Sequence, residues 1–393
     1  MQRRKLLKYS GLVGLGIISS PAQLWSNKLQ NAVLNGREYI LKNDSIMEYA
    51  PLTMPKLSTL KARLHWNENP FGPSKTALRS FKQSAKKGNF YSWDDLSNFT
   101  NRVAEKEGVN SNNIMTGPGS SDLLEKVAIT LFKNGGNVIA ADPCYMSLVN
   151  VVFSMNGKWE SVKLNSNFEH DLDKMESKIN SETKLIYITN PNNPTATVTN
   201  RKKLYDFCEK VSKKVPVFID EAYLEISNGG LKNSMASLVS KGRDVIVSRT
   251  FSKIYGMAGF RMGYIIASEK RLSEINKITR GGMGITGPTI HAAMKSIDDI
   301  NFLDGCKEKL VKNRNFTVNQ LLIRGYDPMP SQTNFIIFEL PKSINPSKFL
   351  TNMYNQKVSV KVMKFWEKDW CRVSIGTLEN METFIKAFDR ALI

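Results

Sequence analysis

The sequence predicts an α/β fold in two units: a large domain with a mainly parallel sheet between helices, and a smaller α+β domain at the C-terminus. Two observations predict it. Short apolar runs bounded by turn residues alternate with helical patterns through the middle of the 393-residue chain. From about residue 300 this alternation stops, and a helix is followed by strand-like runs and a closing helix. Strand–helix alternation is typical of a parallel sheet covered on both faces.

The strands of the large domain are predicted from short apolar runs that end at polar or turn residues. These runs are residues 136–143, 184–191, 215–223, 244–250 and 261–268. Helix-like segments lie between them, at 121–132 and 201–214. In the C-terminal unit the strand candidates are 333–340, 358–363 and 371–377, and the closing helix is 380–393.

The chain is predicted to divide into four segments. They are a signal segment (1–26), a connector and N-terminal arm (27–75), a large cofactor-binding domain (76–298) and a small C-terminal domain (299–393).

Residues 1–26 place a basic stretch before an apolar stretch that is too short to span a bilayer comfortably, which indicates an export signal. Arg3 and Arg4, followed by "KLLK", resemble the bacterial twin-arginine pattern. We therefore expect a periplasmic or otherwise exported protein, tethered to the membrane if the leader is retained. A cytoplasmic location is the alternative.

The formal net charge of +19 raises the question of nucleic acid. However, the lysines are scattered in pairs such as Lys86-Lys87 and Lys202-Lys203, which favours a solvated basic surface over a nucleic-acid interface. The four cysteines form no C-x-x-C pair and the three histidines lie far apart, so we expect no metal site and no disulfide framework.

Polar residues follow the apolar runs at the point where each predicted strand ends. Ligands bind at the carboxyl ends of the strands in open α/β sheets, so these residues are expected along one edge. They are Tyr145, Asn193, Asp220, Tyr223, Ser252 and Lys253.

This set has a coherent chemical meaning. The Lys253 amine can form a Schiff base with an aldehyde cofactor, and the Asp220 carboxylate can keep a pyridine nitrogen protonated. Asn193 and Tyr223 can donate hydrogen bonds to a ring hydroxyl oxygen, and Tyr145 can stack on the ring face. Each residue is a weak signal alone, and their joint order makes the signal strong.

The stretch "TGPGSSDLLEKV" (116–127) predicts a phosphate site, because a glycine-rich turn that opens a helix offers free backbone N–H groups and a favourable dipole to an anion. Ser120 and Ser121 stand at that helix start. Thr250, Ser252 and Arg261 are expected to close the site from the other side, with the Arg261 guanidinium supplying charge.

From about residue 60 to the end, the chain resembles the fold type I pyridoxal 5′-phosphate (PLP) enzymes, specifically the class I/II aminotransferases nearest histidinol-phosphate aminotransferase. The motifs that carry the resemblance occur in the family's order. They are "LHWNENPFGPS" (64–74), "GPGSSDLL" (117–124), "NPNNPTA" (190–196), "FIDEAY" (218–223), "SRTFSKIYGMAGFRMGY" (248–264) and "CRVSIGT" (371–377). The resemblance implies the aspartate aminotransferase-like architecture, with a seven-stranded sheet in the large domain.

The resemblance also implies roles for single residues. Lys253 is implied as the Schiff-base lysine, Asp220 as the partner of the pyridinium nitrogen, and Asn193 and Tyr223 as partners of the phenolic oxygen. Arg372 is implied to bind the substrate α-carboxylate. The residues of the predicted phosphate site are implied to hold the phosphate of PLP.

Three more residues follow from the resemblance. Asn67 and Lys361 are implied as substrate-binding, and Tyr91 is implied to reach the phosphate site of a second subunit, so that a homodimer shares its active sites. The chain departs from the family at three places. Ala196 stands in a turn where the family has glycine, and Lys361 stands where histidinol-phosphate enzymes tend to carry arginine. The segment around Tyr91 also lacks the family's usual Tyr-Pro pair.

The expected function is a PLP-dependent transaminase that moves an amino group between an amino acid, or an amino-acid phosphate such as histidinol phosphate, and a 2-oxo acid. Ping-pong kinetics should follow. Two alternatives stay open: a decarboxylase acting on an amino-acid phosphate, and a non-catalytic binding protein built on the same fold.

Overall fold

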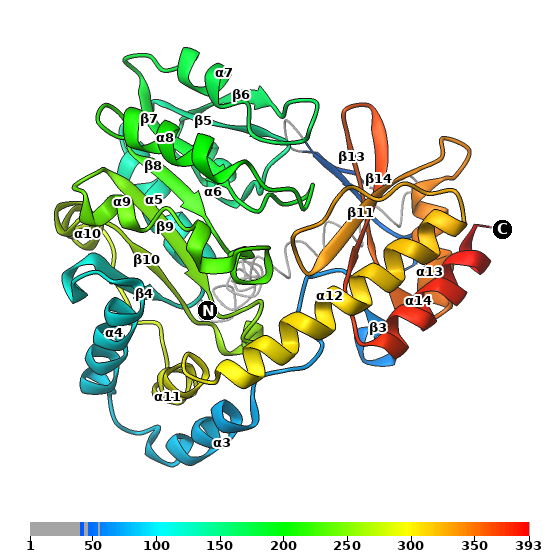
Figure 1. Ribbon diagram of the computed structural model, residues 1–393, viewed down its shortest axis with the longest axis horizontal. Coiled ribbons are helices and arrows are strands. Elements are labelled where there is room, and N and C mark those ends of the chain that lie inside the picture. The colour runs from blue at the N-terminus through cyan, green and yellow to red at the C-terminus, as the bar shows by residue number, and fades with distance from the viewer. Residues whose placement is uncertain (1–39, 43–45, 54–55, 393) are drawn as a thin grey trace, which may run out of the picture.

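The computed structural model describes residues 40–42, 46–53 and 56–392. The predicted export signal lies outside the described residues. Figure 1 shows two units side by side, a larger one built from the first part of the chain and a smaller one that contains the C-terminus, with the long helix α12 (Ile300–Ile323) running between them.

The larger unit holds a seven-stranded sheet with the order β4-β10-β9-β8-β7-β5-β6. Its strands are β4 (Ile114–Gly117), β5 (Asn137–Asp142), β6 (Lys158–Lys163), β7 (Thr183–Thr189), β8 (Val217–Asp220), β9 (Val245–Thr250) and β10 (Gly263–Ile266). Strand β10 runs antiparallel to both of its neighbours, and the other pairs are parallel. The predicted α/β class with a mainly parallel sheet is therefore confirmed.

The helices of this unit cover a sheet whose central strands are buried along their whole length. They are α3 (Lys75–Ser84), α4 (Trp93–Glu107), α5 (Ser120–Phe132), α6 (Ser147–Ser154), α7 (Leu172–Ser177), α8 (Arg201–Val211), α9 (Ser237–Ser240), α10 (Glu269–Asn276) and α11 (Gly287–Ser296). Such burial on both faces explains why the strands appear in the sequence as continuous apolar runs.

The smaller unit holds a five-stranded sheet with the order β1-β2-β13-β14-β11. The strands are β1 (Ile40–Lys42), β2 (Met47–Tyr49), β11 (Phe335–Leu340), β13 (Lys361–Phe365) and β14 (Lys368–Ser374). Strands β3 (Ala62–Arg63) and β12 (Val358–Ser359) form a separate parallel pair. Helices α13 (Pro346–Asn355) and α14 (Leu378–Ala391) complete the unit.

Strands β1 and β2 come from the stretch predicted as a connector, yet they form the edge of the C-terminal sheet. Residue Glu48 of β2 lies opposite Met363 of β13 in that pairing. Strands of three residues are too short to leave a periodic signal, so the sequence did not predict them. The four-segment division of the chain itself stays a prediction.

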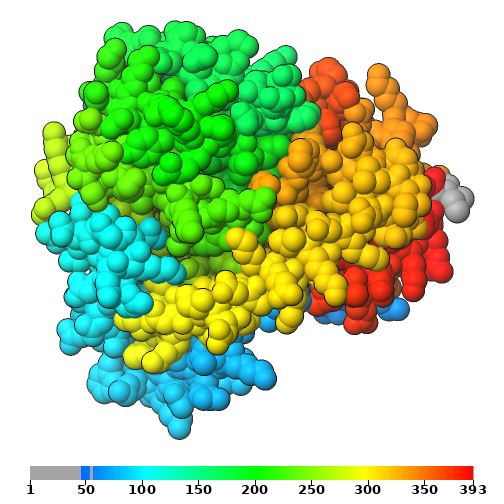
Figure 2. Space-filling model, viewed as in Figure 1, coloured from blue at the N-terminus to red at the C-terminus, as the bar shows by residue number. Residues whose placement is uncertain are grey.

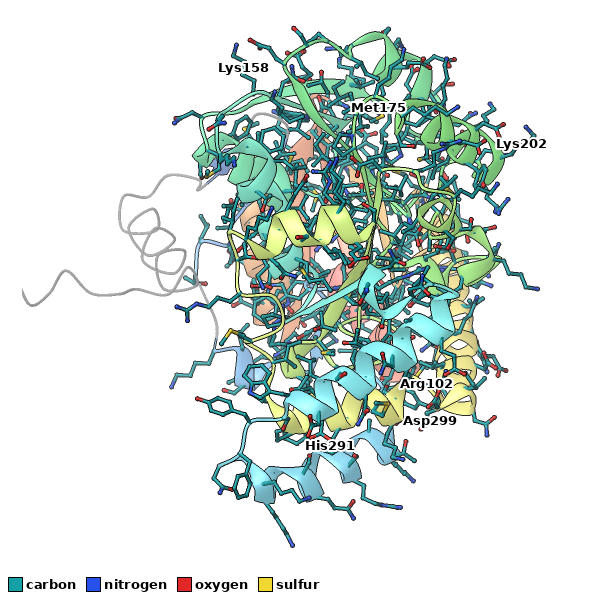
Figure 3. All side chains as sticks on the ribbon, turned by 90° about the vertical axis from the view of Figure 1, so that its left-hand side faces the viewer. Arg102, Lys158, Met175, Lys202, His291 and Asp299 are labelled. Atoms are coloured by element: carbon teal, nitrogen blue, oxygen red, sulfur yellow. The ribbon has the colours of Figure 1, made fainter. Side chains whose placement is uncertain are left out.

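The surface and the interior separate as the composition indicates. Lys158 and Lys202 project outward in Figure 3, and their side chains are 74% and 85% exposed. All four cysteine thiols are buried and free. Within the described ranges, no helix is long and apolar enough to cross a membrane.

Figure 2 shows the two units in contact with each other, and the yellow to orange residues of α12 lie across their junction.

Short 3-10 helices occupy several of the connections. They are η1 (Leu57–Thr59), η2 (Ala85–Lys87), η3 (Ser111–Asn113), η4 (Leu224–Ile226), η5 (Gly230–Asn233) and η6 (Ala258–Phe260).

Candidate functional site

A cavity of 540 Å³ lies where the carboxyl ends of the large sheet's strands face the small sheet. Thirteen of the predicted site residues line it. They are Asn67, Ser120, Ser121, Tyr145, Asn193, Asp220, Tyr223, Thr250, Ser252, Lys253, Arg261, Lys361 and Arg372. The structure does not bring Tyr91 to this cavity: its side chain is 87% exposed and stacks on Trp93 with ring centroids 5.6 Å apart.

Lys253 stands in the turn after β9, with its amine inside the cavity. Its Nζ donates to the backbone carbonyl oxygen of Asn67 at 3.0 Å and lies 5.3 Å from the centre of the Tyr223 ring. Burial is the main cause that lowers the pKa of Lys253 to about 8, with Tyr145 opposing the shift and the Arg372 charge adding to it. The amine is therefore poised to be neutral slightly above neutral pH.

Asp220 ends strand β8 and is buried beside the cavity. Its Oδ1 accepts hydrogen bonds from Ser248 Oγ at 2.8 Å and from the Ala222 backbone N–H at 3.2 Å. Burial raises the pKa of Asp220, and these two bonds partly oppose that rise. Both bonds use Oδ1, which orients the carboxylate and leaves Oδ2 to meet a cationic group from the cavity.

Asn67 links the lysine to the tyrosine. Its backbone carbonyl accepts from Lys253, and its Nδ2 donates to the Tyr223 hydroxyl at 3.1 Å. Asn67 adopts a positive φ of 55°, and Ser374 holds it there by accepting from its backbone N–H at 2.8 Å and donating to its Oδ1 at 3.0 Å. Burial raises the pKa of Tyr223 to about 12, so its hydroxyl stays a donor.

Arg372 extends from β14 into the cavity. Its Nη1 donates to Asn193 Oδ1 at 2.8 Å and its Nη2 donates to the His65 carbonyl at 3.0 Å. These bonds leave the Asn193 Nδ2 amide as the donor that remains for a ligand. The Arg372 Nε is buried without a hydrogen-bond partner anywhere in the described part of the chain, which is a costly arrangement unless a ligand compensates it.

The predicted phosphate site is a backbone cradle at the start of α5. Gly119, at φ 91°, precedes the helix without a side-chain cap, so the first N–H groups of the helix are open to an anion. Arg261 closes the cradle, donating to the Pro118 carbonyl at 3.1 Å and the Ala258 carbonyl at 3.0 Å. A Cβ on Gly119 would overlap Arg261 Nη2, and residues with a side chain rarely adopt a φ of 91°, so the cradle requires glycine.

On the far side of the cradle, Thr250 ends strand β9 and its Oγ1 accepts from the Ser252 backbone N–H at 3.1 Å. Both hydroxyl side chains line the cavity together with Ser120 and Ser121. The turn that carries Asn193 contains Ala196 at φ 65°, fully buried. Ala196 therefore adopts the positive φ that the family's glycine would permit at this position.

Fourteen cavity residues were not predicted from the sequence, among them Ile46, Glu48, Trp66 and Glu68. Trp66 and Glu68 flank Asn67 in the motif at 64–74, so the motif itself was the signal for them. Ile46 and Glu48 had no such signal, because they reach the cavity only through the pairing of β2 with β13 at the other end of the chain.

These donors fit the groups of PLP. A glycine-bounded helix start with an arginine suits a phosphate, an oriented buried carboxylate suits a protonated ring nitrogen, and a buried amine of lowered pKa suits an aldehyde. The buried Arg372, with its unpartnered Nε, adds a place for a second anion beside the ring.

The sequence matches the family Aminotransferase class I and II over residues 60–388. A histidinol-phosphate aminotransferase 2 from Carboxydothermus hydrogenoformans is 31% identical over 337 residues, which cover 84% of this chain and 91% of that protein. A histidinol-phosphate aminotransferase from Moorella thermoacetica is 29% identical, over 84% of this chain and 85% of the relative.

The fold is also similar to solved structures. The histidinol-phosphate aminotransferase from Sinorhizobium meliloti, solved in complex with pyridoxal 5′-phosphate, superposes with a TM-score of 0.76 at 22% identity, covering 85% of this chain and 91% of that one. An aspartate aminotransferase mutant of Thermus thermophilus gives a TM-score of 0.73 at 16% identity, covering 86% and 99%. At these identities the likeness supports the fold alone, and it confirms the predicted aspartate aminotransferase-like architecture.

Proposed function

The chain belongs to the class I and II aminotransferases, and from this premise we propose that the cavity is the active site of a transaminase acting between an amino acid and a 2-oxo acid. Pyridoxal 5′-phosphate is the cofactor. The observation that carries the proposal is the meeting of Lys253, Asp220, Arg261 and Arg372 around one cavity. No pair of these residues is adjacent in the sequence.

The cofactor would be held at four points. Lys253 Nζ would carry it covalently, and Asp220 Oδ2 would pair with its ring nitrogen. The Asn193 amide and the Tyr223 hydroxyl would donate to its phenolic oxygen. The phosphate would sit in the cradle formed by Ser120, Ser121, Thr250, Ser252 and Arg261, and Tyr145 would cover a ring face. When bound, the group supplies an electron sink for the bond that breaks at the substrate Cα.

The chain's own residues would perform the proton transfer. Arg372, held by Asn193 and the His65 carbonyl, would bind the substrate carboxylate and orient the Cα–H bond. Lys253 Nζ, neutral above its pKa of about 8, would then accept the Cα proton. The backbone carbonyl of Asn67 holds that amine in place at 3.0 Å.

A half-reaction screen tests the proposal. The purified, cofactor-loaded protein is mixed with single amino acids while the visible absorption band is followed. At least one amino acid should bleach the band and release its 2-oxo acid, and a second 2-oxo acid should restore it. Release of carbon dioxide in place of the 2-oxo acid would favour the decarboxylase, and a band that no amino acid changes would contradict both enzymes.

We also propose that the protein is a homodimer. Phe90, Tyr91 and Trp93 form an exposed aromatic strip, with side chains 70%, 87% and 48% exposed. A group of neighbouring exposed aromatic side chains is typical of a surface that is buried against another protein surface. Light scattering should give twice the mass of one chain, and Tyr91→Ala should weaken PLP retention if Tyr91 reaches the partner's phosphate site. A monomer that retains PLP normally would contradict this proposal.

We further propose export through a twin-arginine-type pathway, which carries proteins after they have folded and taken up a cofactor. Fractionation of bacterial cells that express the full chain should recover activity outside the cytoplasm. Changing Arg3 and Arg4 together to lysine should shift that activity to the cytoplasmic fraction. Activity that remains cytoplasmic for the unchanged chain would contradict the proposal.

A further inference from the structure

The anion-binding end of the cavity contains two cations side by side. Lys361 of β13 and Arg372 of β14 are direct partners in the antiparallel pairing, and both line the cavity. Cross-strand partners have Cβ atoms about 5 Å apart on the same face. Two adjacent cations would suit a dianion such as a phosphate monoester better than a single carboxylate.

One of these two cations, Lys361, already forms an ion pair with a carboxylate. Glu48 Oε1 of β2 lies 2.7 Å from Lys361 Nζ, and both side chains are mostly buried, at 32% and 22% exposed. Burial lowers the pKa of Lys361 and the Arg372 charge adds to this lowering, while the charge and hydrogen bond of Glu48 partly oppose it. The pair therefore leaves the Arg372 guanidinium as the unneutralised charge at this end of the cavity.

The fold holds Glu48 in that position. Strand β2 pairs with β13 so that Glu48 lies opposite Met363. Next to it, the Tyr49 hydroxyl donates to Asp369 Oδ1 at 2.8 Å, which attaches β2 to the end of β14 as well. The backbone of Glu48 is thus held at the cavity by strand pairing, and its side chain is held by the ion pair with Lys361.

Among the described residues that line the cavity, the other cations, Lys253 and Arg261, belong to the proposed cofactor site. His65 is buried, and burial together with Lys361, Arg63 and Arg372 lowers its pKa to about 3, so its imidazole is neutral. Glu68 faces the cavity and is paired with Arg63, which does not line it. The neighbouring groups therefore leave a single net positive charge for the substrate anion.

We propose that Glu48 is a specificity-determining residue, which neutralises Lys361 and makes the active site select substrates that carry an α-carboxylate over those that carry a phosphate ester in its place. The inference rests on the proposed transaminase function. A phosphate monoester would have to bind one guanidinium while facing the Glu48 carboxylate, and its second charge would remain uncompensated. A carboxylate has one charge to match and meets no such penalty.

The test compares two small ligands that differ only at this end: glycine and O-phosphoethanolamine, which have no side chain to complicate binding. Their dissociation constants for the cofactor-loaded protein are measured by titration of the visible band. The unchanged protein should bind glycine more tightly. In Glu48→Gln, which frees Lys361, the ratio of affinities should shift toward O-phosphoethanolamine by about ten-fold or more, as one charge-assisted hydrogen bond predicts.

Two further variants control the result. Glu48→Gln combined with Lys361→Met should lose the shift, because the freed amine causes it. Glu339→Gln removes the partner of Lys368 from an exposed pair on the same sheet, outside the cavity, and should leave the ratio unchanged. Histidine and histidinol phosphate form a second matched pair and should shift in the same direction.

An unchanged protein that binds O-phosphoethanolamine as tightly as glycine would overturn the inference, as would a ratio that Glu48→Gln does not move. A protein whose band responds to no amino acid would instead refute the proposed function, so the two failures are distinguishable.

Discussion

The two walls of the active site are built in different ways. The cofactor wall comes from successive strand ends of one parallel sheet, so Asn193, Asp220 and Lys253 follow each other in the chain in a simple order. The substrate wall joins β2, β13 and β14, which come from opposite ends of the chain. Arg372, Lys361 and Glu48 meet only because these strands pair.

Because of this difference, we expect changes in the first wall to affect the reaction itself and changes in the second wall to affect the choice of substrate. A residue on the cofactor wall lies at or just after the end of a buried strand, and its neighbours would also contact the cofactor, so a change there should abolish the reaction. The substrate wall sits on a smaller sheet, where Lys361 is ion-paired with Glu48 of the neighbouring strand β2. Changes there should alter which substrate is used while the cofactor stays bound.

The largest effect is expected on the cofactor wall, from Lys253→Ala. Loss of the amine that accepts the Cα proton should reduce kcat by about a thousand-fold or more. The turnover assay with the best amino acid from the screen measures it. Lys202→Ala, which removes a lysine that is 85% exposed, should behave like the unchanged protein. If Lys253→Ala kept full turnover, the cofactor wall would have been assigned incorrectly.

On the substrate wall, Arg372→Lys should lower kcat/KM by between about ten- and a hundred-fold, because an ammonium cannot reproduce the guanidinium's two-pronged contact with a carboxylate. The visible band of bound PLP should persist. Steady-state kinetics measure kcat/KM, and an absorption spectrum shows whether the visible band persists. Complete loss of the cofactor in this variant would show that the two walls do not act separately.

Gly119→Ala tests the phosphate cradle with a smaller change. The added Cβ would overlap Arg261 Nη2, and PLP affinity should fall on the order of ten-fold. Gly242→Ala is the matched control, since Gly242 also has a positive φ, of 71°, but has no atom within 4 Å of the new Cβ. Equal loss of PLP affinity in both variants would point to general backbone strain and away from the cradle.

The smallest expected effect is a dependence of cofactor capture on pH. Burial lowers the pKa of Lys253 to about 8, so the amine is protonated below this pH and neutral above it. Only the neutral amine attacks an aldehyde. The rate at which the cofactor-free protein captures PLP should therefore rise with pH, with its midpoint at about 8. A midpoint near the ordinary lysine value of 10.5 would show that the cavity does not desolvate the amine.

Most of the large domain could be predicted from the sequence because its signals are local. The run 244–250 contains β9, and the run 184–191 covers β7 apart from its first residue, since a buried parallel strand is a continuous apolar run between turns. Strands β1 and β2 could not be predicted, because three residues carry no period and their pairing depends on distant partners.

The same contrast applies to the site. The residues of the cofactor wall follow apolar runs in the sequence. Because ligands bind at the carboxyl ends of the strands in such sheets, these residues could be predicted to lie along one edge. Lys361 was identified by resemblance, but its partner Glu48 was not, because no rule connects an N-terminal segment to a C-terminal strand. Tyr91 lies outside the cavity of its own chain, so its proposed role at the phosphate site of a second subunit rests on the resemblance alone.

Lys253 is proposed to carry the cofactor covalently. Borohydride reduction followed by peptide mapping detects this bond directly. The cofactor-loaded protein is reduced, digested and analysed by mass spectrometry. We predict one modified peptide, with the pyridoxyl group on Lys253, and no modification when the cofactor is omitted. Modification of another lysine, or of none, would contradict the account.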